Sequence, residues 1–169
     1  MSDRIYNVLF LCTGNSARSI LAEAILNQIG KGRFRAFSAG SHPAGQVNPI
    51  VLEILSAQNL PVAELRSKSW DEFAQPGAPA LDFVFTVCDN AAGEVCPVWP
   101  GQPVTAHWSL EDPAAVKGDD ATRRRAVQTA LQLLNRRISV FINLPLATLD
   151  KVALKHEVDA IGRLGPQAR

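Results

Sequence analysis

The sequence lacks any apolar stretch long enough to span a membrane and any strong excess of one charge. Its 169 residues carry 17 Lys and Arg against 16 Asp and Glu, for a net charge of +1. A balance this close to neutral argues against nucleic acid or an anionic membrane as a partner. The N-terminus also lacks the basic, apolar and small-residue regions of a signal peptide. We therefore expect a cytoplasmic protein with no nucleic-acid and no membrane partner.

Cysteine is scarce as well, with Cys12, Cys88 and Cys96 as its three positions. In a reducing cytoplasm, so few cysteines indicate reactivity or metal binding more often than structural disulfides. Seven residues separate Cys88 from Cys96, which is not the short spacing of zinc ligands, and the three histidines are scattered. We expect no metal site and no cofactor, so the cysteines become candidates for direct chemistry.

Apolar runs alternate with amphipathic segments along the chain, without an internal repeat. Strands are predicted at the run ending at Leu11 and over residues 35–39, 81–87 and 104–107. Helices are predicted from Ser19 onward and over 49–57, 70–73, 120–142 and about 147–161. Such alternation predicts an α/β fold: a doubly wound, mainly four-stranded parallel sheet with helices on both faces, plus an extra C-terminal helix.

The length suits one domain with a full core. Pro145 separates the long predicted helix from the final one. We expect residues 1–144 to form the α/β domain. Residues 145–169 would be a helical extension, either packed on that domain or exposed.

The most informative segment joins the first predicted strand to the first predicted helix. It reads Cys12-Thr13-Gly14-Asn15-Ser16-Ala17-Arg18-Ser19. The N–H groups of residues 13–18 can turn toward one centre at a helix N-terminus and hold a tetrahedral oxyanion, and Arg18 can bind two of its oxygens. The same field favours thiolate over thiol. Cys12 is therefore predicted to be an activated nucleophile that attacks phosphorus or arsenic.

The Cys-x5-Arg spacing alone is a weak signal, and its context strengthens it. A strand precedes it, a helix follows it, and Gly14 and Asn15 suit the turn. The alternatives are a buried structural cysteine at a strand end and a non-catalytic oxyanion-binding module. Because parallel strands end at one edge of a sheet, Cys12 and Cys88 are expected to be neighbours.

Several motifs, in this order, resemble the cytosolic arsenate reductases of the low-molecular-weight protein tyrosine phosphatase superfamily. They are the Cys12–Ser19 loop, Ser38-Ala39-Gly40, Thr86-Val87-Cys88-Asp89, Cys96-Pro97 and His107-Trp108-Ser109-Leu110-Glu111-Asp112-Pro113-Ala114. The likeness runs from about Ile5 to Ile142. The segment after Pro145 is not part of it.

The resemblance implies a role for each matching residue. Cys12 would be the nucleophile, Arg18 the oxyanion clamp and Ser19 a hydrogen-bond partner of the thiolate. Asn15 would hold the loop's unusual backbone conformation, since asparagine tolerates left-handed geometry. Asp112 would be the general acid that protonates the leaving oxygen. On the residues alone, Asp112-Pro113 reads more simply as the start of a helix.

Two departures favour a reductase over a tyrosine phosphatase. Phosphatases of this fold usually carry a second cysteine inside the loop and aromatic residues after the Asp-Pro pair, whereas this chain has Ala17 in the loop and Ala114 after Pro113. Cys88 and Cys96 instead offer the further thiols of a disulfide relay that ends at thioredoxin. If Cys96 is idle, glutathione or another low-molecular-weight thiol, followed by glutaredoxin, would be the reductant. Hydrolysis of phosphomonoesters by a phosphatase remains the alternative function.

The resemblance also points to a cation behind the loop. Some of these reductases hold potassium there through an asparagine, a glutamate, a serine and an aspartate. Asn15, Glu23 and Ser38 match the first three, but the loop that should supply the aspartate contains Lys68. The Lys68 ammonium would then stand in the place of the metal ion and pair with Glu23. The alternative is a solvated surface lysine.

Overall fold

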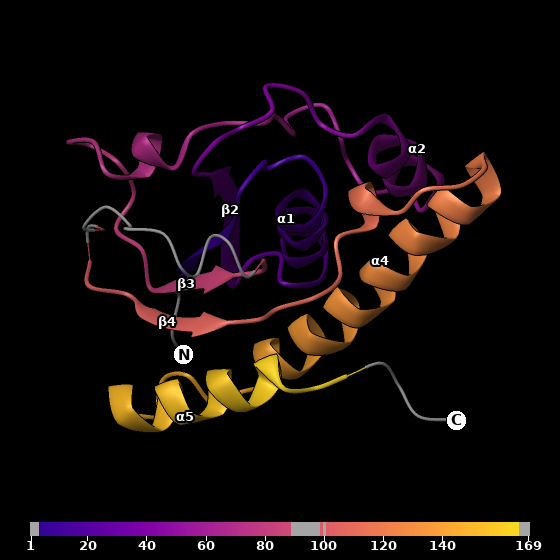
Figure 1. Cartoon of the computed structure of the whole chain (residues 1–169). Helices are drawn as coiled ribbons and strands as arrows, with labels where there is room; N and C mark the ends of the chain where they lie inside the picture. Colours follow the sequence, from indigo (N-terminus) through magenta and orange to yellow (C-terminus); the bar gives the residue numbers. More distant parts are fainter. Residues whose placement is uncertain (1–3, 89–98, 100, 166–169) are drawn as a thin grey trace.

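The computed structural model describes residues 4–88, 99 and 101–165, and its centre is a four-stranded parallel sheet (Figure 1). The strand order is β2-β1-β3-β4. The strands are β1 (Tyr6–Cys12), β2 (Phe34–Gly40), β3 (Phe83–Thr86) and β4 (Val104–His107). All neighbouring strands pair in parallel. The order reverses between β1 and β3, which makes their carboxyl ends the expected place for a ligand.

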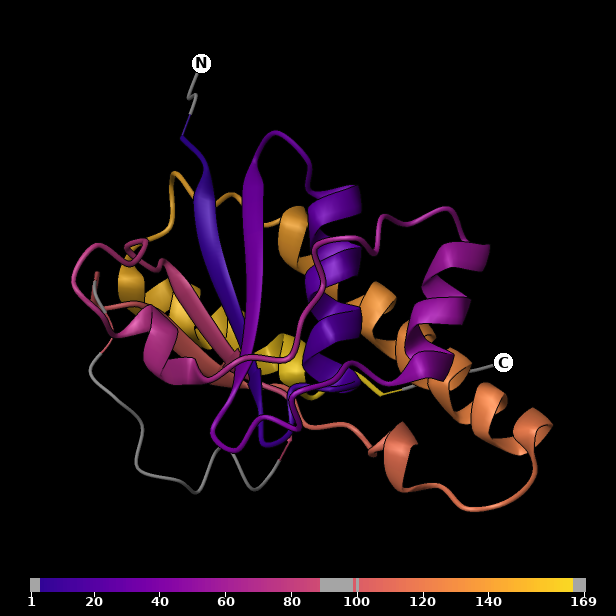
Figure 2. The same cartoon turned by 90° about the horizontal axis from the view of Figure 1, so that it is seen from above.

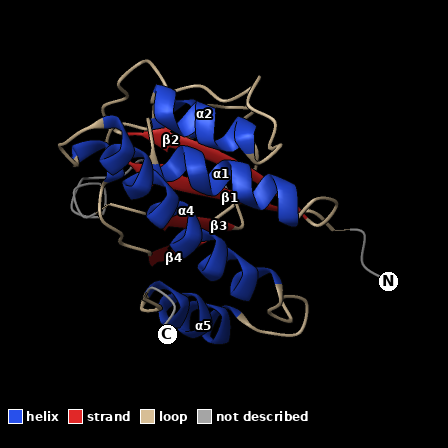
Figure 3. Cartoon of the chain, turned by 90° about the vertical axis from the view of Figure 1, so that its right-hand side faces the viewer, coloured by secondary structure: helices blue, strands red, loops and turns tan. Residues whose placement is uncertain are grey.

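The four α-helices within the described residues cover one face of this sheet (Figure 3). They are α1 (Arg18–Ile29), α2 (Pro49–Ala57), α4 (Asp120–Ile142) and α5 (Lys151–Gly162). Val8 and Phe10 of β1 point into the core beneath them, and Leu9 and Leu11 point to the opposite face. Side chains alternate along a strand, so an apolar run such as β1 must be covered on both faces.

The second face is covered by the short 3-10 helix η1 (Trp70–Phe73), which lies across the sheet from α1 and α2 (Figure 2). Trp70 and Phe73 pack with Leu9 and Leu11 in a smaller apolar cluster. The predicted α/β class, the four parallel strands and the coverage of both faces are thus confirmed, although the helix on the second face is a short one.

Polar side chains set the ends of several helices. Asn48 accepts hydrogen bonds from the first amides of α2, and Asp119 caps α4 in the same way. The last helix begins at Lys151 rather than near Ala147, because Asp150 accepts a hydrogen bond from the Ala153 amide and fixes the start. The sequence-based boundary was therefore about four residues early.

Helix α5 packs against the edge strand β4. Val158 and Ile161 are buried in the larger core, and Lys155 Nζ donates to the Thr105 carbonyl at 2.6 Å. Over residues 145–165, the C-terminal extension thus packs on the α/β domain. No helix in the described ranges is long and apolar enough to cross a membrane.

Candidate active site

The loop between β1 and α1, residues 12–18, lies where the sheet order reverses; we call it the oxyanion loop. Cys12 is the last residue of β1, and its pairing partner in β2 is Gly40. Cys88 follows β3, whose Thr86 pairs with Leu11. Both cysteines are free thiols and 3% exposed. The expected neighbourhood of Cys12 and Cys88 at the carboxyl ends of adjacent strands is therefore present.

The carbonyl groups of the oxyanion loop are bonded on its outer side. The amides of His42, Ala44 and Asn48 donate at 2.9 Å to the carbonyls of Thr13, Gly14 and Ser16 respectively. In a planar trans peptide the next N–H points away from such a carbonyl. Three loop amides, those of residues 14, 15 and 17, therefore face the opposite side. This arrangement suits an anion, which amide N–H groups bind.

Asn15 fixes the shape of the loop. Its backbone has φ of 47°, in the left-handed region that asparagine tolerates better than most residues. Its side-chain oxygen accepts a hydrogen bond from the Lys68 amide at 2.9 Å, so its NH2 group must face Ser19 Oγ, at 2.7 Å. The predicted left-handed conformation is present, and the buried side chain ties the loop to residues 67–68.

Two groups hydrogen-bond the sulfur of Cys12. The Asn15 amide donates to Cys12 Sγ at 3.2 Å, and Ser19 Oγ lies 2.9 Å away. Ser19 Oγ already accepts from Asn15, so its own hydrogen is free to point at the sulfur. Burial nevertheless raises the pKa of the Cys12 thiol by more than these hydrogen bonds lower it. The direction of this shift is opposite to the lowering expected from the loop's field, because desolvation of the thiolate is the largest effect.

Arg18 begins α1 and connects the oxyanion loop to a second segment, residues 109–116, which we call the acid segment. Arg18 Nη1 donates to the Leu110 carbonyl at 3.1 Å, and Nη2 lies 3.4 Å from Asp112 Oδ2. Asp112 also caps the 3-10 helix η2 (Pro113–Ala115) by accepting from the Ala114 amide at 2.9 Å. The two sequence-based interpretations of Asp112 are therefore compatible, since it begins a helix and also faces Arg18.

Cys88 contacts the first residue after Cys12. The Thr13 amide donates to Cys88 Sγ at 3.2 Å, and Thr13 Oγ1 is 3.5 Å from the same sulfur. These two contacts hold the Cys88 sulfur directly beside the oxyanion loop. Cys96 lies outside the described residues.

A buried ion pair lies behind the oxyanion loop. Lys68 is 8% exposed, and its Nζ lies 3.8 Å from Glu23 Oε1 and 2.9 Å from the Arg66 carbonyl. Ser38 Oγ donates to the same Glu23 oxygen at 2.5 Å. Burial raises the pKa of Glu23 and lowers that of Lys68, and each partner opposes the shift of the other. The solvated-lysine alternative is therefore wrong. A buried ammonium already sits among the residues that matched a potassium site.

Close backbone approach explains Gly40. A β-carbon at this position would clash with the carbonyl of Thr13 and lie 3.0 Å from that of Cys12. The Gly40 amide donates to the Lys68 carbonyl at 2.9 Å. Glycine thus lets β2 end directly against the oxyanion loop.

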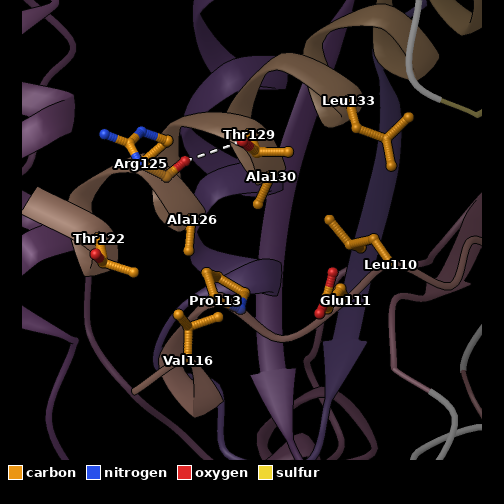
Figure 4. Close-up of a pocket in the computed structure, with 10 residues that line it drawn as sticks. All are labelled: Leu110, Glu111, Pro113, Val116, Thr122, Arg125, Ala126, Thr129, Ala130 and Leu133. Atoms are coloured by element: carbon orange, nitrogen blue, oxygen red, sulfur yellow. Dashed lines mark hydrogen bonds between the residues drawn. The ribbon is translucent and has the colours of Figure 1, made fainter. Parts of the chain in front are cut away.

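Two features next to the acid segment were not predicted from the sequence. Arg137 of α4, which is 4% exposed, donates to the Ser109 carbonyl, and nothing in the helix pattern singles it out. A cavity of about 460 Å³ lies between the acid segment and α4 (Figure 4). In the figure Leu110, Pro113 and Val116 line one side and α4 the other. No three His, Cys, Asp or Glu side chains of the described ranges are grouped as metal ligands.

The chain matches the low molecular weight phosphotyrosine protein phosphatase family over residues 7–152. An arsenate reductase of Halalkalibacterium halodurans is 31% identical over 134 residues, covering 79% of this chain and 93% of that protein. One of Oceanobacillus iheyensis is 32% identical over 141 residues, covering 83% of this chain and 96% of that protein. These alignments span most of both partners, so they concern the whole α/β unit.

Solved structures agree with this likeness. An Archaeoglobus fulgidus arsenate reductase has a TM-score of 0.58 at 30% identity, covering 78% of this chain and 98% of that one. A Corynebacterium glutamicum thioredoxin-dependent arsenate reductase has a TM-score of 0.58 at 28% identity, covering 82% of this chain and 61% of that one. With its family match and these relatives, the chain belongs to the low molecular weight phosphotyrosine protein phosphatase superfamily, beside the superfamily's arsenate reductases.

Proposed function

We propose that this protein reduces arsenate to arsenite, with Cys12 as the nucleophile in the oxyanion loop and Cys88 as the second thiol. The observation that carries the proposal is the pair of free, buried cysteines joined through Thr13, whose amide donates to Cys88 Sγ at 3.2 Å. Hydrolysis of a phosphate ester needs one thiol, whereas reduction needs two electrons and hence two thiols. The arsenate reductases among the relatives support the same choice.

The first step is attack of Cys12 on the oxyanion. Arsenate would lie against the amides of the loop and the guanidinium of Arg18. Because burial raises the pKa of Cys12, its proton would pass to the bound arsenate dianion. The thiolate, hydrogen-bonded by Ser19, then forms an S–As bond. One arsenate oxygen leaves as water with the proton of Asp112, which lies beside Arg18.

The second step transfers the electrons. Cys88 attacks the sulfur of Cys12, an S–S bond forms, and the S–As bond breaks with its electron pair going to arsenic. Arsenic falls from +5 to +3 and departs as arsenite, while the two thiols are oxidised to one disulfide. The hydrogen bond from the Thr13 amide holds the Cys88 sulfur beside the residue that follows Cys12.

Recovery of the reduced enzyme needs an external thiol. In our proposal Cys96 attacks Cys88 and moves the disulfide outward, where thioredoxin reduces it. A Corynebacterium relative is named as thioredoxin-dependent, which favours this partner. If Cys96 takes no part, a low-molecular-weight thiol and glutaredoxin would complete the cycle. Whether Cys96 takes part therefore decides between thioredoxin and a low-molecular-weight thiol as the reductant.

A second candidate function is phosphatase activity. Cys12, hydrogen-bonded to Ser19, and the Arg18–Asp112 pair would supply the nucleophile, the cation and the acid of hydrolysis through a phosphoenzyme, and Cys88 is not needed for it. We expect weak hydrolysis of small aryl phosphates beside the main reaction. A cytoplasmic location, without nucleic-acid or membrane partners, fits both functions.

A paired assay tests the proposal. One preparation is assayed for arsenate reduction with a thioredoxin system, and again with glutathione and glutaredoxin, and for hydrolysis of 4-nitrophenyl phosphate. We expect arsenate turnover with one reductant and weak hydrolysis. Hydrolysis without reduction by either reductant would favour the phosphatase. Oxyanion binding that survives Cys12→Ser, in a parent without turnover, would favour a binding module.

A further inference from the structure

Arg137 is a buried charge whose recorded partners are all main-chain carbonyls. Its Nε and Nη2 donate to the Leu164 carbonyl at 3.0 and 2.9 Å, and its Nη1 donates to the Ser109 carbonyl at 2.9 Å. Burial lowers the pKa of Arg137, and no carboxylate in the described ranges offsets that effect. A buried guanidinium is costly unless its donors are satisfied, so these three hydrogen bonds hold two distant segments firmly together.

One of the two segments is the end of α5. Leu164 follows α5 by two residues, close to the helix terminus where unpaired carbonyls carry partial negative charge. A cation is favoured at such a terminus. Arg137 therefore joins the end of α5 to Ser109, the first residue of the acid segment.

Helix α5 also contacts His107 and Trp108, the two residues before Ser109. Trp108 Nε1 donates to the Val158 carbonyl at 2.9 Å, and Trp108 is fully buried. At Gly162 a β-carbon would lie 2.5 Å from the His107 carbonyl oxygen and 2.9 Å from the Trp108 ring. Residues 107–109 are thus fixed by α5 and Arg137 directly before the chain reaches Asp112.

The acid segment is only partly covered by α4. Leu110 and Pro113 are buried, but a cavity of about 460 Å³ lies between Leu110, Pro113 and Val116 on one side and α4 on the other (Figure 4). The Leu110 carbonyl, one residue after Ser109, accepts from Arg18 at 3.1 Å. The orientation of the segment toward Arg18 therefore depends on where Ser109 is held.

From these contacts we infer that Arg137, together with α5, positions Asp112 for proton transfer to the leaving oxygen. Arg137 is a positioning residue, since it acts through the backbone of the acid segment. The inference rests on the proposed role of Asp112. Gly162 and Leu164 lie beyond residue 152, where the family match ends, so this support comes from outside the matched region.

A double-mutant cycle tests the inference. Arg137→Met fills the site without donors, and Asp112→Asn removes the transferable proton. We expect Arg137→Met to lower kcat for arsenate reduction by about tenfold in the parent. In the Asp112→Asn background the same change should cost less than about twofold, because it acts through a group already disabled. A purely structural role would lower kcat by the same factor in both backgrounds.

Matched variants keep the test decisive. Arg136→Met is the control, since within the described residues Arg136 donates only to the exposed end of the chain, at the Gly165 carbonyl (2.8 Å). We expect its kcat to stay within about twofold of the parent. Gly162→Ala disturbs the contact of α5 with His107 and Trp108. It should therefore lower kcat more in the parent than in the Asp112→Asn background. Arg137→Lys keeps the buried charge and replaces Arg137→Met if that variant fails to fold.

The outcomes separate the two claims. An equal loss in both backgrounds, or no loss in either Arg137→Met or Gly162→Ala, overturns the positioning role while arsenate reduction stands. If the parent reduces no arsenate, the proposed function fails. The cycle is then measured on 4-nitrophenyl phosphate hydrolysis, where an Asp112-dependent loss still supports the positioning role and an equal loss overturns it.

Discussion

The oxyanion loop and the acid segment face each other across Arg18, yet they are held in opposite ways. The loop is fixed from outside by three backbone amides of residues 42–48, and from within by the Asn15 side chain. The acid segment has a cavity beside it and is held by Arg18, which donates to the Leu110 carbonyl, and by Arg137, which donates to the Ser109 carbonyl. The loop is thus fixed by backbone contacts and its own asparagine, whereas the acid segment is held by arginine side chains from α1 and α4.

This difference assigns different risks to mutation. A change inside the loop removes chemistry or the anion cradle at once, because each group there has a direct contact with Cys12 or its neighbours. A change near the acid segment alters the position of Asp112, the proposed proton donor. The predictions below probe the first half from the largest expected effect to the smallest, and the Arg137 cycle probes the second.

Cys12→Ser should abolish arsenate reduction and any phosphatase activity. A hydroxyl at this position is not ionised at neutral pH, and even the buried thiol has a raised pKa. We expect a loss of at least about a thousandfold in both assays, measured beside the thermal unfolding of each protein. Activity within about tenfold of the parent would show that another residue is the nucleophile.

Cys88→Ser should separate the two chemistries. Reductive turnover should stop after the first adduct, since the second electron-donating thiol is gone, while hydrolysis of 4-nitrophenyl phosphate should stay within about threefold. Thr13, which donates to Cys88, can donate to serine as well. Equal loss of both activities would mean that Cys88 supports the structure, or that the phosphatase assignment is right.

Asn15→Ala tests how firmly the loop is pre-formed. The change removes hydrogen bonds to the Lys68 amide and to Ser19, and it puts alanine at a φ of 47°. We expect a loss of about 2–4 kcal/mol in unfolding free energy by urea denaturation, with reduced kcat. Asn27→Ala is the control, because this side chain is hydrogen-bonded to the Ala36 backbone and has no contact with the oxyanion loop among the described residues. A loss below about 1 kcal/mol would show that the outer amides suffice.

The pH dependence of stability should reveal the buried Glu23. Because burial raises its pKa, the folded state binds a proton more tightly than the unfolded state does. Stability therefore falls as pH rises from about the ordinary value of 4.5 through the raised pKa. Relative to Glu23→Gln, the Tm of the parent should decline by a few degrees over this window. Exposed Glu53→Gln is the control, and the same decline relative to it would contradict the assignment.

The smallest expected effect is that of potassium. If the Lys68 ammonium takes the place of a cation behind the loop, Tm and arsenate reduction should be equal in potassium and sodium salts at matched ionic strength. A buried ammonium is part of the chain, whereas a bound ion stabilises only in proportion to its concentration. A clear rise in Tm with potassium would show that Lys68 leaves room for an ion.

The elements could be predicted from the sequence because their signals are local. The apolar run of β1 marks its own boundary, and the helix over 120–142 begins and ends where its pattern does. The Cys12 loop was likewise predicted from neighbouring residues, whereas the role of Asn15 came from the family resemblance. Properties that depend on distant segments were not accessible. The raised pKa of Cys12 comes from burial by the folded chain, and the role of Arg137 from contacts with α5.

The adjacency of β1 and β3 has a consequence for chain entropy. A bond between Cys12 and Cys88 would close a loop of roughly 75 residues in the unfolded chain, and cross-links of that span stabilise the folded state by about 4 kcal/mol. If the proposed Cys12–Cys88 disulfide forms, the oxidised protein should melt several degrees above the reduced protein. Thermal unfolding after a single addition of arsenate would thus report how far the thiols have reacted.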